Sequence, residues 1–275
     1  MPELPEAEVV CRQLRAHLRG KAIQSVWIGR EDIVRVGLSS LDWYAGVQVV
    51  DVQRLGKSVV LACARNGEQR YVVVELGMTG LLLLHRESAP SERHIHVVLH
   101  FNPDSQFPLH YWNARRFGRL SLLTQHEFQD YCRRRFGLDP LAVSEDGFVS
   151  LIKGCRGRIK TLLLHQQKIA GIGNIYANEM LFRAGIHPQA LGHRISVPRI
   201  RNLYHGMRDL LGEAIEKGGS SIRDFLSPDG NAGTFQRWHQ VYQKAGQRCA
   251  NGCGTMIRVL RAERSSFYCP HCQKR

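Results

Sequence analysis

Apolar residues near the start of the chain recur at the spacing of one helical face. Val10, Leu14 and Leu18 lie four residues apart, and Gly20 follows them. Side chains four positions apart share a face of an α-helix, and glycine commonly ends one. The pattern predicts one amphipathic helix over residues 6–19.

Beyond this helix, seven short runs of β-branched and aromatic residues are separated by glycine, asparagine, proline or charged residues. They are Ile23–Trp27, Val47–Val52, Val59–Ala62, Tyr71–Leu76, Leu81–Leu84, His96–Phe101 and Arg119–Leu122. Short strands divided by turn residues are typical of a β-sandwich or a flattened barrel. We therefore expect a β-rich N-terminal half.

The rest of the chain has helical periodicity. A helical stretch near 124–134 is followed by turn residues at 137–141, which separate the two halves. The helices expected after this turn span 145–153, 159–165, 175–184 and 200–217. We place three domains at residues 1–136, 141–240 and 241–275.

Composition narrows the class of partner. The 275 residues include 38 Lys and Arg against 24 acids, a formal net charge of +14, and 43% are apolar. This apolar fraction fits a globular protein, and the positive charge suits nucleic acid or an anionic membrane. No apolar run approaches the roughly 18 residues of a membrane span, and the acidic start lacks the basic region of a secretory signal. We expect a soluble intracellular protein.

Four of the eight cysteines gather in the tail as two close pairs. Cys249 pairs with Cys253, and Cys269 pairs with Cys272 after fifteen intervening residues. Two close thiolate pairs are typical of a tetrahedral structural zinc site and fit a disulfide framework poorly. Two alternatives stay open, namely four reduced cysteines without metal and a site in which His271 replaces a cysteine. The segments between the pairs, 257–261 and 264–268, predict a hairpin with basic residues near its tip.

The first residues can place a reactive group at the N-terminus. If Met1 is removed, Pro2 carries a free secondary amine with a reference pKa of about 7.7–8.0, so roughly a tenth of it is uncharged at neutral pH. Such an amine attacks a sugar aldehyde carbon and forms a cationic iminium. Glu3 and Glu6 lie within one helical turn and suit acid and base roles. The alternative is an ordinary helix start, because carboxylates favour the positive end of a helix.

Three other segments carry residues suited to DNA. Residues 171–176 open a helix with paired glycines, whose backbone N–H groups can approach a phosphate. The alternative is a structural turn in which Asn174 is the N-cap. Arg115 and Phe117 combine a guanidinium with a ring that can enter a base stack, and their alternative is a basic surface turn. Met78 lies between glycines and suits a wedge, with an ordinary core residue as its alternative.

Taken together and in this order, these segments resemble formamidopyrimidine-DNA glycosylase, a bacterial enzyme that excises oxidised purines and cleaves the abasic strand. The resemblance covers nearly the whole chain. It rests on residues 1–6, Lys57, 76–80, 115–118, 171–176, 218–221 with 224–225, 240–242 and the four tail cysteines. It implies an α+β multidomain protein, with an N-terminal β-sandwich and flanking helices, a helical domain with a helix-two-turns-helix motif, and a β-hairpin zinc finger.

The resemblance also implies roles for individual residues. Pro2 would attack the sugar C1′, Glu3 would protonate the ring oxygen, Glu6 would support the lesion site, and Lys57 would bind a flanking phosphate. The implied DNA-binding residues are Met78, Arg115 and Phe117, which fill the void left by the flipped nucleotide, and His94, Lys160, Asn174, Tyr176 and Arg264. The implied cofactor is one structural Zn²⁺ on Cys249, Cys253, Cys269 and Cys272.

The activity implied by the resemblance is that of a bifunctional DNA glycosylase and AP lyase in base excision repair, acting by β/δ-elimination. Its partner is damaged double-stranded DNA. The resemblance implies a monomer in the bacterial cytoplasm that is associated with the nucleoid and not with a membrane. Residues 227–235 match a full-length loop over the flipped base, which favours oxidised purines over the oxidised pyrimidines of the endonuclease VIII group.

Three positions depart from the family pattern. Glu75 stands where a basic or histidine residue is common, so a DNA contact is lost or repulsion is introduced. Asn113 and Ala114 replace Asp-Pro, which predicts a less rigid turn. Three residues instead of two separate Cys249 from Cys253, which alters the first knuckle of the finger.

Two other functions stay open. A non-catalytic or altered-specificity DNA-damage-binding protein, including an endonuclease VIII-like one, is compatible with Glu75. A zinc-ribbon RNA-binding protein is the third hypothesis, and it leaves Pro2, Glu3 and Glu6 unexplained.

Overall fold

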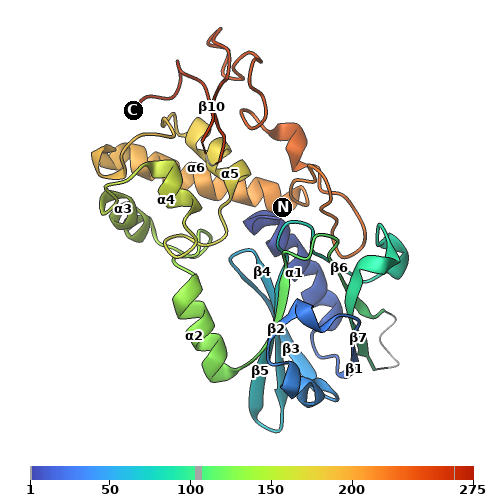
Figure 1. The fold of residues 1–275 in the computed structure, drawn as a ribbon. Coiled ribbons are helices and arrows are strands. Elements are labelled where there is room, and N and C mark those ends of the chain that lie inside the picture. Colours follow the sequence, from blue (N-terminus) through green and yellow to red (C-terminus); the bar gives the residue numbers. More distant parts are fainter. Residues whose placement is uncertain (1, 103–106, 263) are drawn as a thin grey trace. The chain divides into compact units, whose positions relative to one another are not determined.

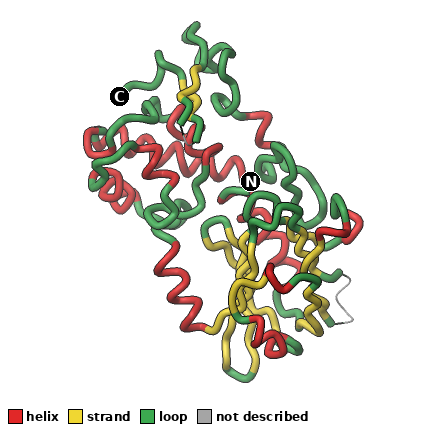
Figure 2. Tube along the Cα trace, in the orientation of Figure 1, coloured by secondary structure: helices red, strands yellow, loops and turns green. Residues whose placement is uncertain are grey.

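The computed structural model describes every residue except 1, 103–106 and 263, and it divides the chain into two compact units. The first unit comprises Met1–Arg134 and Lys217–Gln236, and the second comprises the remaining residues. Strands dominate the first unit and helices the second (Figure 1, Figure 2). The finer division into three domains stays a prediction.

Two sheets form most of the first unit. The antiparallel four-stranded sheet has the order β1 (Ile23–Ile28), β7 (Ile95–Phe101), β8 (Leu109–Trp112) and β6 (Leu81–Leu83). The five-stranded sheet has the order β2 (Val34–Val36), β9 (Arg119–Thr124), β5 (Glu68–Glu75), β4 (Ser58–Arg65) and β3 (Gln48–Leu55). Its β2 and β9 are parallel, and its other pairs are antiparallel.

The seven expected strands are all present, and two further strands were not expected. β2 has three residues, too few to display a period of two. All four residues of β8 are buried, so this strand lacks the alternation of apolar and polar residues that marks a strand in sequence.

The main core of the first unit lies between the sheets and helix α1 (Leu4–Leu18). α1 buries Val10, Leu14 and Leu18 and packs against β3 and β4. A second cluster covers the other face of the five-stranded sheet, where helix α2 (Gln125–Arg135) packs Phe128 against Tyr71 with ring centroids 3.9 Å apart. The central strands β4 and β5 are therefore buried on both faces, as expected for a sandwich flanked by helices.

Four helices and a hairpin form most of the second unit. They are α3 (Glu145–Lys153), α4 (Ile159–Leu164), α5 (Asn174–Arg183), α6 (Val197–Glu216), β10 (Arg258–Leu260) and β11 (Ser266–Tyr268). The apolar face of α6 is buried, and α6 packs against α3 and α5. α3 matches its predicted span because Ser144 caps it, its hydroxyl accepting the Gly147 N–H at 3.2 Å.

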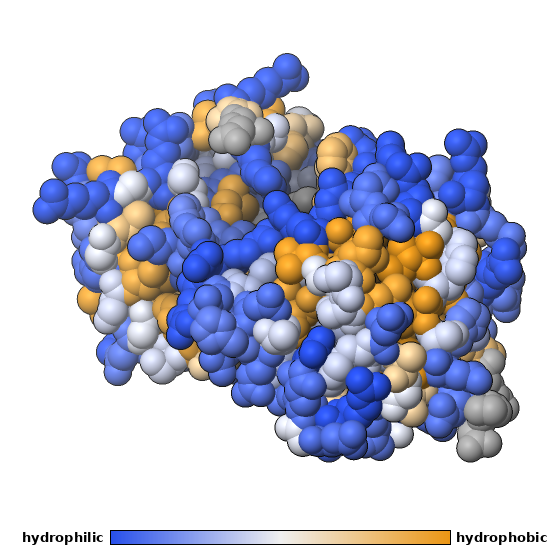
Figure 3. Space-filling model, turned by 60° about the horizontal axis from the view of Figure 1, so that its bottom comes forward, coloured by the Kyte–Doolittle hydropathy of each residue, from blue (hydrophilic) through white to orange (hydrophobic). Residues whose placement is uncertain are grey.

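Short 3-10 helices connect these elements. They are η1 (Glu31–Ile33), η2 (Leu38–Tyr44), η3 (Arg86–Ser88), η4 (Glu92–His94), η5 (Gly192–Arg194) and η6 (Phe235–Trp238). Hydrophilic residues cover most of the face drawn in Figure 3, and apolar residues gather in patches. Within the described ranges, no helix has the length and apolar character of a membrane span.

Candidate functional site

The start of α1 is built around two buried carboxylates. Glu3 is the N-cap, its side chain accepts the backbone N–H of Glu6, and the Glu3 N–H donates to Glu6 Oε2 at 2.7 Å. This reciprocal capping box fixes the first turn, and both carboxylates are nearly inaccessible, at 2% and 1% exposure. Pro2, which is also buried, is thereby held beside the helix start. Met1, whose removal the mechanism requires, lies outside the described residues.

The second oxygen of Glu6 binds a segment far away in the sequence. Glu6 Oε1 accepts the Ser220 N–H at 2.7 Å. The preceding Gly219 has a φ of +77°, and a Cβ there would lie 2.8 Å from the same oxygen. Only glycine allows so close an approach at this backbone angle. Both Glu6 oxygens are therefore occupied by backbone donors, which suits a supporting role better than proton transfer.

Two turns of the first unit meet backbone to backbone. Met78 lies in the turn after β5, and Phe117 lies in the turn between β8 and β9. A Cβ on Gly77, whose φ is +62°, would lie 2.4 Å from the Gly118 nitrogen, so the two turns touch. Met78 is 37% exposed and Phe117 58% exposed, and the Arg115 guanidinium lies 5.0 Å from the Phe117 ring centre. The two turns thus present two apolar tips and one cation together.

The side chain of Asn113 restrains these turns. It is fully buried, and its Oδ1 accepts from the Thr79 hydroxyl at 2.9 Å and from the Arg116 N–H at 3.1 Å. Its Nδ2 donates to the Tyr111 hydroxyl at 2.9 Å, and Thr79 Oγ1 accepts the Arg115 N–H at 3.1 Å. This network restrains the turn through hydrogen bonds, and the lower rigidity expected at Asn113-Ala114 stays a prediction.

Three more positions from the sequence analysis lie in the first unit, namely the expected DNA contacts Lys57 and His94 and the unusual Glu75. Lys57 is half-buried in the tight turn between β3 and β4. His94 ends η4, its ring meets Trp112 edge-on at 5.8 Å, and its backbone oxygen accepts the Asn113 N–H at 2.9 Å. Glu75 Oε1 accepts from the Tyr131 hydroxyl at 2.9 Å, so the unusual carboxylate is held within its own unit.

In the second unit, side chains of α4 and α5 converge on the loop and second strand of the hairpin. The Lys160 ammonium, 5% exposed, donates to Ser265 O at 2.7 Å and to Ser266 Oγ at 2.9 Å. Asn174 Nδ2 donates to the same Ser265 oxygen at 3.2 Å. Asn174 is the first residue of α5, and Gly173 is the N-cap. The alternative in which Asn174 is the N-cap is therefore wrong. The side-chain amide of Asn174 is hydrogen-bonded to the hairpin and does not cap the helix.

A cavity of about 430 Å³ opens beside this convergence, and Lys160, His165, Arg264 and Ser266 are among its lining residues. Arg264 is exposed next to the anchored Ser265. A concave site with several cations suits phosphate. Tyr176, by contrast, has no exposed surface, so this structure keeps its ring inside the unit.

Sequence analysis missed two polar residues of α5 that fix the segments around the hairpin. The Glu179 carboxylate, 1% exposed, accepts the backbone N–H groups of Gln240, Val241 and Tyr242 at 2.8, 3.0 and 2.7 Å. Burial raises the pKa of this carboxyl group. Asn178 Oδ1 accepts the Phe267 N–H at 2.7 Å. The sequence signal that could have identified them is the presence of polar residues within an otherwise largely apolar helix.

The four tail cysteines form one cluster. Their sulfur atoms all lie within 4.8 Å of one another, with Cys249 and Cys272 at 3.8 Å and Cys253 and Cys269 at 3.6 Å. Tetrahedral ligation with bonds of about 2.3 Å requires sulfur separations of about 3.8 Å, so the set fits a four-thiolate metal site. The three-residue spacing is accommodated by Gly252 with a φ of +70°.

Comparisons with known proteins agree with this geometry. The formamidopyrimidine-DNA glycosylase N-terminal domain model matches residues 1–120, the H2TH domain model of the same enzyme matches 136–226, and a zinc finger found in FPG and IleRS matches 246–275. The formamidopyrimidine-DNA glycosylase of Solibacter usitatus is 44% identical over 278 residues, with all of both chains covered. That of Cupriavidus pinatubonensis is 37% identical, with 99% of this chain and 100% of the relative covered.

Solved structures give the same result. A Lactococcus lactis FPG mutant in complex with Fapy-dG-containing DNA aligns with a TM-score of 0.88 at 29% identity, with all of both chains covered. The MutM (FPG) protein of Thermus thermophilus aligns with a TM-score of 0.85 at 33% identity, over 99% of this chain and 98% of that chain. Fold and comparisons together define a DNA glycosylase that acts on damaged DNA and carries a zinc-finger domain. The chain belongs to the formamidopyrimidine-DNA glycosylase family, and the predicted α+β fold class is confirmed.

Proposed function

We propose that this protein is a bifunctional DNA glycosylase and AP lyase that excises 8-oxoguanine and formamidopyrimidines from duplex DNA. The observation that carries the proposal is the capping box of Glu3 and Glu6, which holds Pro2 buried at the start of α1. A secondary amine in a fixed position beside two carboxylates is the arrangement that Schiff-base chemistry at a sugar carbon needs.

The chemistry follows from this arrangement once Met1 is removed. The lone pair of the Pro2 nitrogen attacks C1′, the glycosidic bond breaks and its electrons leave with the base, and the proton lost from the amine ends on the departing base. Glu3 donates a proton to the sugar ring oxygen, so the ring opens and the nitrogen becomes part of a cationic iminium. The iminium makes the C2′ proton acidic, and loss of that proton expels the 3′ phosphate. A second elimination expels the 5′ phosphate, and hydrolysis frees the amine.

Different residues carry recognition of the substrate. Met78, Arg115 and Phe117 would enter the base stack where the damaged nucleotide has swung out, because wedge side chains stabilise a kinked duplex. The residues proposed to hold the DNA backbone are Lys57, His94, Lys160, Asn174 and Arg264, together with Tyr176, which would act through its main chain because its ring is buried. The full-length loop at 227–235 favours oxidised purines over oxidised pyrimidines.

We further propose that the cysteine cluster holds one Zn²⁺ per chain. Four thiolates close the coordination sphere, so the metal would supply folding free energy and no reactive position. Cys249, Cys253, Cys269 and Cys272 would hold it and fix the hairpin that carries Arg264. We expect a monomer that works on duplex DNA in the bacterial cytoplasm, at the nucleoid.

Borohydride trapping tests the proposal. Incubation with duplex DNA containing 8-oxoguanine and sodium borohydride should give a covalent complex, and Pro2→Gly should reduce it strongly. The matched control is Pro5→Gly, which makes the same change three residues later and keeps the Pro2 amine. Absence of a trapped complex with the unaltered protein, alongside salt-sensitive DNA binding, would select the non-catalytic binder instead. Efficient trapping on oxidised pyrimidines alone would select the endonuclease VIII-like alternative.

A further inference from the structure

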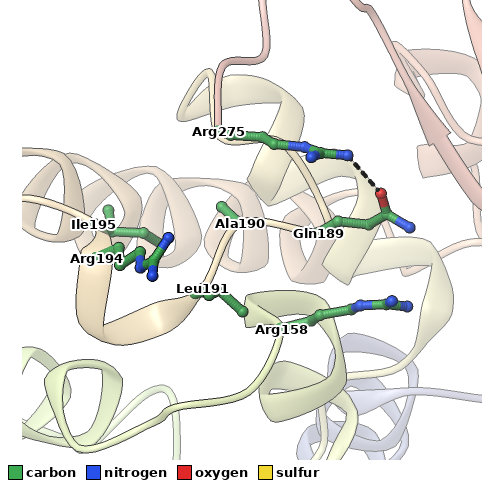
Figure 4. A pocket seen from close by; sticks show the side chains of 7 residues that line it. All are labelled: Arg158, Gln189, Ala190, Leu191, Arg194, Ile195 and Arg275. Carbon is green, nitrogen blue, oxygen red and sulfur yellow. Dashed lines mark hydrogen bonds between the residues drawn. The ribbon is translucent and has the colours of Figure 1, made fainter.

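A second cavity of the second unit has a positively charged wall and no acidic residue in its lining. It has a volume of about 310 Å³ and is lined by Arg158, Gln189, Ala190, Leu191, Arg194, Ile195 and Arg275. Figure 4 shows the side chains of Arg158 and Arg275 extending in the same direction on either side of Gln189, with Arg194 at the other end of the cavity. Three guanidinium groups thus surround a small, partly apolar hollow.

The frame of this cavity is rigid. The segment 155–159 is hydrogen-bonded to the segment 190–193, with Ile159 N to Ala190 O at 2.8 Å, Gly192 N to Gly157 O at 3.1 Å and His193 N to Cys155 O at 2.8 Å. A Cβ on Gly192 would lie 3.0 Å from the backbone oxygen of Cys155, so the two segments are in close contact. Arg158 and Arg194 therefore project from hydrogen-bonded backbone, because Arg194 N also donates to Leu191 O at 2.9 Å, and this lowers the entropic cost of binding at these two arginines.

The charges of this cavity are not balanced inside the protein. Among the residues that the structure describes, no carboxylate forms an ion pair with Arg158, Arg194 or Arg275. Arg183 and Arg201 of the same unit, by contrast, pair with Glu213 and Glu145 at 2.7 and 2.8 Å. Arg275 instead donates to Gln189 Oε1 at 3.2 Å, a neutral acceptor. Like charges gathered without a counter-charge favour an anion, and guanidinium groups match the oxygen geometry of phosphate.

The position of this cavity identifies the source of the anion. Arg158 and Gln189 also line the 430 Å³ cavity that contains Lys160 and Arg264. The two cavities are therefore neighbours that share a wall. A polymer with regularly spaced phosphates, bound at Lys160 and Arg264, would bring its next phosphates to the adjoining cavity.

We propose that Arg158, Arg194 and Arg275 bind a phosphate of the DNA backbone beyond the phosphates held by Lys160 and Arg264, and so lengthen the stretch of duplex that the enzyme grips. This inference rests on the proposed function, because that function assigns Lys160 and Arg264 to the backbone. We call the cavity of Arg158, Arg194 and Arg275 the tri-arginine cavity. It binds the backbone of undamaged DNA and takes no part in the chemistry.

The test compares Arg194→Gln/Arg275→Gln with the unaltered protein on duplexes that carry a stable abasic analogue and are shortened one base pair at a time. Arg158 is left intact because it lines both cavities. The matched control, Arg201→Gln/Arg208→Gln, removes the same charge from α6 outside either cavity. Melting temperature and zinc content verify that each variant is folded. Affinity is measured over a range of salt concentrations.

On the longest duplex, the cavity variant should bind roughly tenfold more weakly at 0.1 M salt, and its slope of log K against log salt should be smaller by about 1, the values for one lost phosphate. The difference should vanish once the duplex is too short to reach the cavity, and the control should show neither change. An unaltered slope on long DNA would overturn the proposal, and so would an effect that persists on the shortest duplex. Binding of inorganic phosphate at the cavity with an unaltered DNA slope would also overturn it.

Borohydride trapping on the short duplex separates this inference from the proposed function. Trapping by the unaltered protein together with an unaltered salt slope in the cavity variant would remove the inference alone. Loss of trapping in the unaltered protein together with the predicted slope change would remove the enzymatic proposal and leave the DNA grip.

Discussion

The two units hold their candidate functional groups in opposite ways. In the first unit, buried Asn113 restrains the turns that carry the exposed tips Met78 and Phe117, and buried Glu6 fixes the helix start beside Pro2. In the second unit, the candidate DNA-binding cation Lys160 is itself buried and bound to hairpin oxygens, and exposed cations such as Arg264 line open cavities. The contrast indicates that the first unit supplies fixed geometry and the second supplies charge. Changes in the first should therefore alter chemistry and discrimination, and changes in the second should alter affinity and its salt dependence.

Loss of the metal site should have the largest effect. Cys269→Ser removes a fully buried thiol of the cluster, and structural zinc contributes roughly 10–16 kcal/mol of apparent binding free energy to such fingers. The hairpin should unfold, and Lys160 and Asn174 should lose Ser265 as their partner. Duplex affinity should fall at least about 100-fold, because two phosphate contacts each carry about a factor of ten at 0.1 M salt.

Zinc analysis, DNA titration and hydrogen exchange measure this effect, and the first unit should keep its protection from exchange. The control is Cys132→Ser, which removes a free thiol of α2. Full affinity in a zinc-free Cys269→Ser protein would contradict the assignment of the grip to the hairpin.

Glu6→Gln should break the first unit's anchor. An amide places an NH₂ group against one of the two backbone N–H donors, from Glu3 or Ser220, that the carboxylate now accepts. We expect a loss of about 3 kcal/mol in unfolding free energy and a large fall in trapping rate, with an unaltered salt slope of DNA binding. Glu87→Gln, at an exposed position, should change neither quantity. A Glu6→Gln protein that traps at the normal rate would show that the capping box is dispensable.

Asn113→Ala should loosen the turns that carry Met78 and Phe117. It leaves the Thr79 hydroxyl and the Arg116 N–H without their acceptor, at an expected cost of about 2 kcal/mol. Discrimination between bases opposite the lesion should weaken, because Arg115 loses its fixed aim. Excision rates with each opposite base measure this, and the exposed Asn202→Ala of α6 is the control. Unaltered discrimination despite the stability loss would confine Asn113 to a structural role.

A pH effect of similar or smaller size should appear in the second unit. Burial and, to a smaller extent, the Lys244 charge lower the pKa of His239 from 6.5 to about 4. His239 therefore favours folding fully above pH 6.5, and this contribution is lost as pH falls from 6.5 towards 4, because the unfolded chain binds the proton first. The loss between pH 7 and pH 5 should be about 2 kcal/mol.

Chemical denaturation at the two pH values, with His239→Gln alongside, measures this contribution. The variant should lose less stability on acidification than the unaltered protein. The exposed Asn202→Ala of α6, which changes no titratable group, should show the pH dependence of the unaltered protein. An equal pH dependence in His239→Gln and the unaltered protein would contradict the assignment.

Local signals in the sequence were sufficient for most elements. Helical periodicity predicted α3, whose N-cap in the structure is Ser144, and the two close cysteine pairs predicted the metal site. The short strands β2 and β8 escaped because neither displays a period of two. The hydrogen bonds that build the site could not be predicted because they join residues far apart in the sequence. Glu6 and Ser220, for example, lie 214 positions apart.

The function of single polar residues also depended on partners far away in the sequence. Asn174 is a good N-cap by residue type, yet its amide binds Ser265 of the hairpin. Asn113 is a weaker turn former than Asp-Pro, yet its side chain is hydrogen-bonded to Thr79 and Tyr111. Residue type predicted what these groups can do, and the tertiary fold decided which partner they have.

The most direct measurement is the mass of the peptide that carries the trapped sugar. After borohydride reduction and proteolysis, the account predicts that the DNA remnant lies on a peptide that begins at Pro2 and lacks Met1. A remnant attached to a lysine, or full lyase activity in a protein that retains Met1, would contradict it.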